Sequence, residues 1–247
     1  MITEIMSIPR RFNGPPRSGN GGYVCGRLAK YLSGPVSVRL RVPPPLEQDL
    51  KVEASDDEAR LFDGETLVAL ARRIELEVAP PAAPTFAHAE VASKSYVGFV
   101  RHLLPTCFVC GPERAEGDGM RIFPGPTAGG SVLAAPWVPH ASLATGSQRV
   151  SPEFLWAALD CAGAFAVLPA GSDPILLGEL SARLDSDVVI GEECVVVAWP
   201  LGIEGRKRYA GTAIYSGSNA PVAVARATWI EIPAARSGDS PVIHKPR

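Results

Sequence analysis

A repeated segment constrains this chain more than any other feature of its sequence. Residues 68–78, Val-Ala-Leu-Ala-Arg-Arg-Ile-Glu-Leu-Glu-Val, return in similar form as residues 222–232, Val-Ala-Val-Ala-Arg-Ala-Thr-Trp-Ile-Glu-Ile. Each copy closes a similar series, in which a helix rich in small residues precedes an extended run opened by Pro35 or Pro174. Self-similarity of this kind predicts the same structural unit twice. We therefore expect a tandem α+β protein with pseudo-two-fold symmetry.

Composition excludes several classes of protein. The 247 residues are 46% hydrophobic and 20% charged, as in a soluble globular protein. A formal net charge of −2 argues against a nucleic-acid-binding surface. No apolar run is long enough for a membrane span, and the first residues do not resemble a signal peptide. Five cysteines, an odd number, argue against a secreted disulfide framework. We expect a cytoplasmic protein with reduced thiols and neither nucleic-acid nor membrane partners.

Two helices are expected, one in each repeat. The first should begin at Asn20, a favoured N-cap residue type, and continue to about Ser33, where Gly-Pro follows. The second should begin at Ser151, with Pro152 at the first helical position, and continue to about Leu168. Both segments are rich in small residues, which suits helices that pack closely on a sheet.

Strand-like segments follow each helix. They are expected at 36–42, 50–54, 59–62 and 66–78 in the first half, and at 120–123, 131–137, 176–184, 194–200, 206–215 and 222–232 in the second. We divide the chain into a first unit at 1–84, a linker at 85–106, a second unit at 107–233 and a flexible tail at 234–247.

Three short motifs resemble the hotdog fold of acyl-CoA thioesterases. Residues 12–16, Phe-Asn-Gly-Pro-Pro, followed by 20–23, Asn-Gly-Gly-Tyr, resemble the loop and central-helix start of that family. Residues 107–111, Cys-Phe-Val-Cys-Gly, resemble the opening of another such unit, and 155–160, Leu-Trp-Ala-Ala-Leu-Asp, resemble the second central helix of double-hotdog thioesterases. The resemblance implies a tandem (double) hotdog with two central helices, each wrapped by a curved antiparallel sheet. It also implies that the sheets are continuous and that the pantetheine arm of an acyl-CoA enters between the units.

Asp160 is the sharpest catalytic candidate. The other side chains of 154–168 are apolar or small, and a helix that is apolar all round is buried. A carboxylate far from the helix start cannot serve as a cap there, and burial raises its pKa towards the range useful for a general base. In a thioesterase it could activate the attacking water or attack the thioester carbonyl itself. The alternative is a structural aspartate hydrogen-bonded to its neighbours.

Residues 20–23 are the second candidate. Gly21 and Gly22 expose backbone N–H groups at a helix start, which could stabilise a thioester oxyanion, with Tyr23 beside them in the substrate site. Asn20 could order the water or donate to the carbonyl. Close helix packing for the glycines and N-capping for Asn20 are the alternatives. The family arrangement implies that Gly21 and Gly22 lie opposite Asp160 in one composite site.

Two further candidates are weaker on the sequence. The resemblance places a catalytic hydroxyl near Ser181, although an exposed strand serine is the favoured interpretation of that residue. The glutamine that double-hotdog relatives carry on the last strand is absent from 227–229, Ala-Thr-Trp. The basic triplet Arg206, Lys207 and Arg208 could meet the phosphates of CoA at a tunnel mouth, or form a solvated hairpin turn.

The cysteines do not predict a metal site. Cys107 and Cys110 have zinc-like spacing, but a structural zinc needs four ligands. The other thiols are isolated in sequence: Cys25, Cys161 and Cys194. The four histidines form no pair at helical ligand spacing: His88, His102, His140 and His244. We expect neither metal nor cofactor, and a tight turn with buried thiols at Cys107–Cys110.

The leading interpretation is an acyl-CoA thioesterase that cleaves the thioester between the two units. The alternative is a non-catalytic double hotdog protein that binds acyl-CoA or another apolar ligand. A hydratase is less favoured because no histidine lies near either central helix. Assembly into a homo-oligomer through sheet edges and the identity of the acyl chain are left open.

Overall fold

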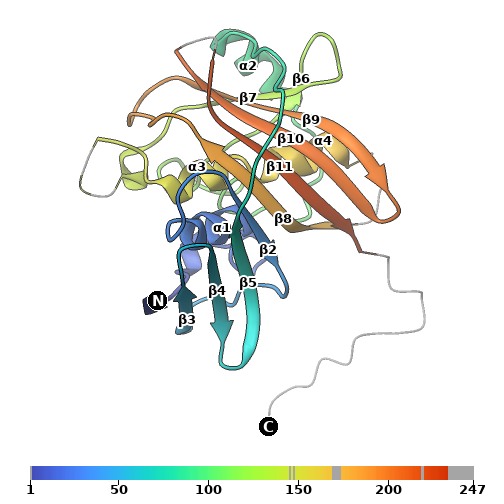
Figure 1. The fold of residues 1–247 in the computed structure, drawn as a ribbon. Coiled ribbons are helices and arrows are strands. Elements are labelled where there is room, and N and C mark those ends of the chain that lie inside the picture. Colours follow the sequence, from blue (N-terminus) through green and yellow to red (C-terminus); the bar gives the residue numbers. More distant parts are fainter. Residues whose placement is uncertain (1, 145, 147, 169–173, 218–219, 233–247) are drawn as a thin grey trace.

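The strands among the described residues form one antiparallel sheet. The computed structural model describes residues 2–144, 146, 148–168, 174–217 and 220–232, so the predicted flexible tail at 234–247 lies outside the described residues. The eleven strands run in the order β1-β3-β4-β5-β2-β8-β11-β10-β9-β7-β6 (Figure 1). Their bounds are β1 Ile2–Met6, β2 Val36–Leu40, β3 Leu50–Ala54, β4 Glu58–Asp63, β5 Thr66–Arg73, β6 Gly125–Pro126, β7 Leu133–Trp137, β8 Ile175–Leu184, β9 Cys194–Glu204, β10 Lys207–Ser216 and β11 Pro221–Glu231.

The two halves of the chain meet where β2 pairs with β8. At this seam Val36 is opposite Ala182, and Ser37 is opposite Ser181. Outward from the seam the order is β2, β5, β4, β3 on one side and β8, β11, β10, β9 on the other. The two similar sequence segments thus begin in β5 and in β11, each second from the seam. The predicted continuous sheet is therefore observed.

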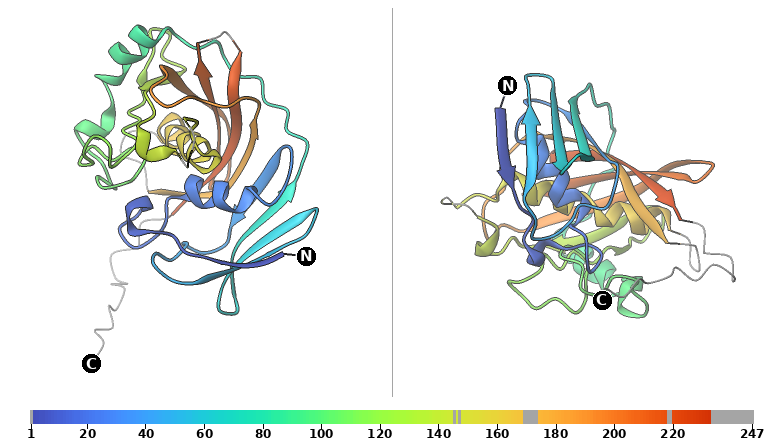
Figure 2. Two further views of the ribbon diagram at one scale, coloured as in Figure 1. Left: turned by 90° about the vertical axis from the view of Figure 1, so that its left-hand side faces the viewer. Right: turned by 90° about the horizontal axis from the view of Figure 1, so that it is seen from below.

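Three of the four helices among the described residues lie against the concave side of this sheet, whereas the helix that follows the first-half strands packs on β7 and β6 and joins a second core cluster on the opposite face. Their bounds are α1 Gly21–Ala29, α2 Phe86–Ser93, α3 Pro152–Ala158 and α4 Cys161–Val167, with short 3-10 turns at Arg10–Phe12, Val97–Phe99 and Ala141–Leu143. Figure 2 shows the second-half strands curving around α3 and α4, with α1 alongside between these helices and the first-half strands. The main core fills the space between helices and sheet.

Alternation along the seam strands explains which side chains face the helices. In β2, Val36 and Val38 are buried and Arg39 is exposed. In β8, Leu180 and Ala182 pair with these valines and are also buried. Successive side chains of a strand point to opposite faces, so the residues between them lie on the outer face of the sheet.

The second central helix is broken, contrary to the expectation of a continuous helix at 151–168. The Leu159 carbonyl accepts a 2.7 Å hydrogen bond from Oγ1 of Thr212 on β10. The Gly163 N–H bonds instead to the carbonyl of Asp160, whose backbone has φ −85° and ψ −83°. The Thr212 hydroxyl thus bonds to the Leu159 carbonyl, which in a continuous helix would accept the Gly163 N–H. As a result Asp160 stands at the junction of α3 and α4.

Other boundaries also differ from the expectations. The strand predicted at 120–123 is absent, that at 66–78 ends at Arg73, and α1 ends at Ala29 rather than near Ser33. Strand β1 was not predicted, and α2 forms within the stretch 85–106 that we expected to be a linker. No helix among the described residues is long and apolar enough to cross a membrane.

Candidate active site

Asp160 is held by donors from the other half of the chain. Its Oδ2 accepts a 2.8 Å hydrogen bond from the Gly22 N–H and a 2.9 Å bond from Nδ2 of Asn20. The residue is 2% exposed, and its Oδ1 is buried with no hydrogen-bond partner among the described residues. The structure therefore brings together Asp160, Asn20 and Gly22. The resemblance implied that Gly21 and Gly22 lie opposite Asp160, and it did not include the bond from Asn20.

Burial dominates the electrostatics of this carboxyl group. Loss of solvent raises the pKa of Asp160 from 3.8 to about 7, opposed by the Gly22 N–H and the Asn20 amide and reinforced by the charge of Cys107. Desolvation disfavours the charged form, and two hydrogen bonds to one oxygen offset it only in part. The direction of this shift is the one that burial was expected to produce.

Close helix contact makes the Gly22–Asp160 bond possible. A Cβ on Gly22 would lie 2.5 Å from Cβ of Asp160 and 2.6 Å from the carbonyl oxygen of Trp156. One turn later, a Cβ on Gly26 would lie 2.6 Å from Cα of Glu153. The two glycines thus let the backbone of α1 approach α3 directly. Gly22 therefore allows both the close packing of α1 on α3 and the hydrogen bond to Asp160.

The Asn20 side chain forms hydrogen bonds through both its oxygen and its nitrogen. Its Oδ1 accepts a 2.9 Å bond from the Tyr23 N–H and caps α1, as expected of an N-cap residue. Its Nδ2 donates to Asp160 and also lies 3.7 Å from Sγ of Cys161. The capping bond fixes the side-chain rotamer of Asn20, so its Nδ2 group already points to the Asp160 carboxylate.

A large cavity borders this group. Its volume is about 1300 Å³, and its lining includes Gly21, Asn20, Asp160 and Cys161. Both halves contribute, through residues 14–21 and 40–44 of the first and segments of the second that include Phe165, Leu177 and Trp229. Gly21 is the first residue of α1, where an N–H has no intrahelical acceptor. The cavity therefore has apolar walls with the Asp160 carboxyl and a helix start on them.

Three exposed arginines also line the cavity. They are Arg17, Arg41 and Arg101, and none makes an ion pair among the described residues. Their sequence positions give no sign of a group, because they are far apart in the chain and each lies in an ordinary loop. Only the folded cavity reveals them as one group.

Tyr23 packs in the core rather than at the cavity. Its ring stacks on Phe12 with centroids 4.3 Å apart, and its hydroxyl accepts a 2.8 Å bond from Arg27. The residue is 2% exposed and does not line the cavity. Its position indicates that it anchors the start of α1.

Ser181 and the basic triplet lie away from the cavity. The Ser181 hydroxyl donates a 2.9 Å bond to Ser37 across the seam, on the outer face of the sheet, opposite to the face that packs on the helices. Arg206, Lys207 and Arg208 lie at the β9–β10 turn, where Arg208 pairs with Glu231 at 3.0 Å. None of these four residues lines the cavity.

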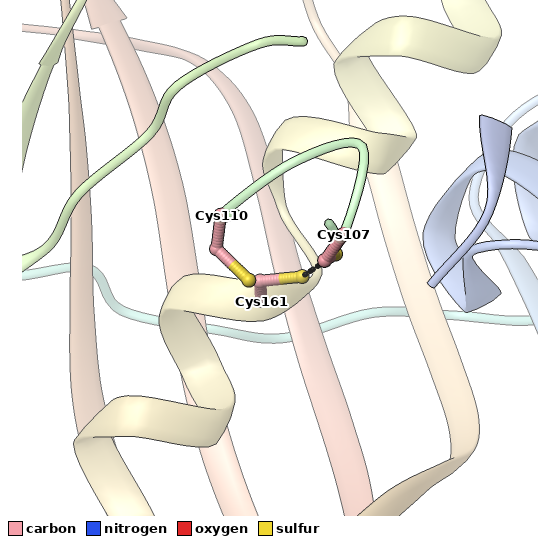
Figure 3. Close-up of side chains that lie close together, drawn as sticks. All are labelled: Cys107, Cys110 and Cys161. Atoms are coloured by element: carbon pink, nitrogen blue, oxygen red, sulfur yellow. Dashed lines mark hydrogen bonds between the residues drawn. The ribbon is translucent and has the colours of Figure 1, made fainter. Parts of the chain in front are cut away.

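A group of three thiols adjoins Asp160. The sulfur atoms of Cys107, Cys110 and Cys161 lie within 4.8 Å of one another and are buried, which differs from the expectation that Cys161 is isolated (Figure 3). The pKa of Cys107 is far below its ordinary value, because the thiols of Cys110 and Cys161 hydrogen-bond to its sulfur; those bonds raise the pKa of both donors. Cys161 is 54 residues from Cys107 in sequence, so spacing alone could not reveal this group.

Solved structures share this fold over nearly the whole chain. An acyl-CoA thioesterase II from Mycobacterium marinum superposes with a TM-score of 0.59 at 10% identity, covering 93% of each chain. The tesB protein of Mycobacterium avium subspecies paratuberculosis gives 0.60 at 10% identity, covering 94% of this chain and 93% of that one. A protein of unknown function with the hotdog fold from Alicyclobacillus acidocaldarius gives 0.52 at 9% identity, covering 94% of each.

These likenesses define the class of fold. The chain is an α+β double hotdog, and its structural neighbours include hotdog thioesterases, which confirms the expectation for the fold. No protein-family model matches the sequence, and no curated protein matches it either.

Proposed function

We propose that the protein is an acyl-CoA thioesterase that hydrolyses its substrate in the cavity between the two halves, with Asp160 as base or nucleophile. The observation that carries the proposal is the buried Asp160 on the cavity wall, with Oδ2 held by two donors and Oδ1 without a partner. A carboxylate with one oxygen fixed and the other free can accept a proton or attack without first losing its orientation.

The chemistry requires few further groups. As base, Asp160 would take a proton from water that attacks the thioester carbonyl; as nucleophile, it would form an acyl anhydride that water then opens. In both routes the C–S bond breaks and the CoA sulfur leaves. The Gly21 N–H at the start of α1 suits the carbonyl oxygen, on which negative charge develops. The Gly22 N–H is occupied by Asp160 and therefore serves a positioning role.

The dimensions and charges of the cavity suit a CoA ester. Its volume of about 1300 Å³ exceeds the roughly 300–1,000 Å³ of sites for drug-sized ligands. Apolar side chains such as Leu177, Phe165 and Trp229 suit an acyl chain. The exposed, unpaired Arg17, Arg41 and Arg101 suit the phosphates of the nucleotide end. These three arginines replace the basic triplet as our candidate phosphate contacts.

A non-catalytic acyl-CoA-binding protein is the second candidate. The observation that favours it is the position of Ser181 on the outer face of the sheet, which leaves Asp160 without a nearby hydroxyl partner from that strand. In this case the same cavity would bind ligand without turnover.

One assay separates the two candidates. The purified protein is tested for release of free CoA from short, long and aromatic acyl-CoAs, together with the variants Asp160→Asn and Ser181→Ala. We expect turnover by the native protein, loss of at least about a hundredfold in Asp160→Asn, and near-native turnover in Ser181→Ala. Saturable binding without turnover would establish the second candidate, and turnover retained in Asp160→Asn would remove Asp160 from the chemistry.

A further inference from the structure

The thiols of Cys107, Cys110 and Cys161 form a second chemical centre on the cavity wall. The first two lie on one loop and the third on the first residue of α4, so three thiols from two separate parts of the chain converge (Figure 3). The Sγ atoms of Cys107 and Cys161 are 3.7 Å apart, and all three sulfurs lie within 4.8 Å of one another. No disulfide joins any of these cysteines.

From this geometry we propose that Cys107, Cys110 and Cys161 bind a zinc ion. Two thiolates at the usual zinc–sulfur distance of about 2.3 Å from a tetrahedral ion lie about 3.8 Å from each other. The 3.7 Å between Cys107 and Cys161 corresponds to that edge. The other pairs need to approach one another by at most about 1 Å, which is the kind of adjustment that ligands make when a metal binds.

The loop of Cys107–Cys110 is shaped to present two sulfurs on one side. The Gly111 N–H donates a 2.9 Å bond to the Cys107 carbonyl and closes the turn. A Cβ at Gly111 would lie 2.5 Å from that carbonyl oxygen, so the turn admits glycine only. A 2.8 Å bond from the Phe108 N–H to the Asn13 carbonyl holds the loop against the N-terminal segment. The loop thus has a fixed conformation without needing the ion.

A side-chain donor lies beside the three sulfurs. Nδ2 of Asn20 lies 3.7 Å from the sulfur of Cys161. N–H donors around ligands orient them and stabilise the charge of the thiolate. Buried thiols that only fill space have no need of such donors.

All three thiols line the cavity, so an ion held by them would lie at the cavity wall. Three thiolates already exceed the charge of Zn²⁺, which disfavours the Asp160 carboxylate as a further ligand. His102 also lines the cavity, but its Nδ1 accepts the Leu104 N–H, so Nε2 carries the proton in the neutral ring. Water is therefore the expected fourth ligand, as in zinc sites with three protein ligands.

Cobalt titration tests the site independently of any catalytic activity. Protein kept reduced and freed of metal with a chelator is titrated with Co²⁺, a spectroscopic substitute for Zn²⁺. We expect one equivalent to produce a thiolate-to-cobalt charge-transfer band that Zn²⁺ abolishes. Cys161→Ser should bind metal at least about a hundredfold more weakly. Loss of a direct ligand lowers the metal affinity more than loss of a residue that only hydrogen-bonds to a ligand. Cys194→Ser, a buried thiol on β9 outside the group, should bind like the native protein.

X-ray absorption on the zinc-loaded native protein keeps the test independent of how the variants fold. We expect three sulfur neighbours at about 2.3 Å and one nitrogen or oxygen neighbour. No cobalt–thiolate band in the native protein, an equal band in folded Cys161→Ser, or a zinc shell without sulfur would each overturn the proposal. Zinc binding in a protein without thioesterase turnover would leave this inference standing and remove only the proposed function.

Discussion

The N–H of Gly22 and the carboxylate of Asp160 are joined by a hydrogen bond of 2.8 Å that links the two halves of the chain. The Cβ of Asp160 would also lie 2.5 Å from a Cβ on Gly22. The same contact thus requires a backbone donor and forbids a side chain, which ties the position of the catalytic candidate to the packing of α1 on α3.

Gly22→Ala is expected to destabilise the protein by about 2 kcal/mol, since inserting a methyl group into a close-packed site typically costs about 1–3 kcal/mol. Turnover should fall with it, because α1 must move away from Asp160. Urea unfolding gives the free energy. Gly129→Ala is the matched control, because a Cβ there meets nothing within 4 Å. Equal stability of the two variants would contradict the packing argument.

Asn20 allows capping and positioning to be separated. Asn20→Ala should lose about 1 kcal/mol of stability with the N-cap, whereas Asn20→Ser keeps a capping residue type. The alanine and serine side chains cannot donate to Asp160 as the Asn20 amide does. The kcat of both variants should therefore fall by a similar factor. Thermal unfolding and steady-state kinetics measure the two effects. A serine variant with native kcat would show that the Asn20 amide has no part in positioning.

Thr212→Val tests the origin of the helix break. Removing the hydroxyl leaves the Leu159 carbonyl buried without its donor, at a cost of roughly 1–3 kcal/mol. We expect turnover to fall more than the loss of stability explains, because Asp160 follows Leu159 directly. Thr212→Ser restores the hydroxyl and should recover most of the turnover. If Val and Ser behave alike, the hydroxyl does not determine the junction.

The cavity arginines should affect substrates that carry the nucleotide end of CoA. Arg41→Gln and Arg101→Gln are each expected to raise KM for an acyl-CoA about fivefold, equivalent to roughly 1 kcal/mol for an exposed charged contact. KM for an acyl-N-acetylcysteamine, which lacks the phosphates, should not change. Arg206→Gln, in the β9–β10 turn, is the control. A larger effect in Arg206→Gln would return the phosphate contacts to the basic triplet.

Asp160→Asn should stabilise the folded protein at alkaline pH, measured after chelator treatment so that no metal contributes. The folded-state pKa of about 7 lies above the ordinary 3.8, so folding favours the protonated carboxyl. The ionised group therefore destabilises the native protein above pH 7, and this cost falls as pH decreases towards the ordinary pKa. The gain in unfolding free energy should be on the order of a few kcal/mol at pH 8 and small near pH 4. A gain independent of pH would contradict this assignment of the cost to burial.

The fold and the burial of the Asp160 carboxylate could be predicted from the sequence. The repeat of 68–78 in 222–232 predicted two similar units, and the apolar surroundings of Asp160 predicted its burial. The resemblance to the hotdog family also implied that Gly21 and Gly22 lie opposite Asp160. These features are local in sequence or belong to a motif, which is why they could be predicted.

The remaining features of the site depend on contacts between distant residues. The Leu159 carbonyl bonds to Thr212, 53 residues away, so the local pattern continued to predict a helix. Cys161 is likewise distant in sequence from the two thiols that it meets. The three cavity arginines come from three separate loops. Ser181 lies on the outer face of the sheet, since strand register rather than residue type decides which face a side chain occupies.

The seam between β2 and β8 makes the sheet nearly symmetric, yet the helices on it are not equivalent. No residue of α1 is acidic, whereas the α3–α4 junction carries Asp160, and the donors to that carboxylate come from the start of α1. A symmetric pair of identical subunits would have to keep donors and acid in every copy. In one continuous polypeptide each helix is free to specialise, so the molecule should saturate with a single ligand per chain.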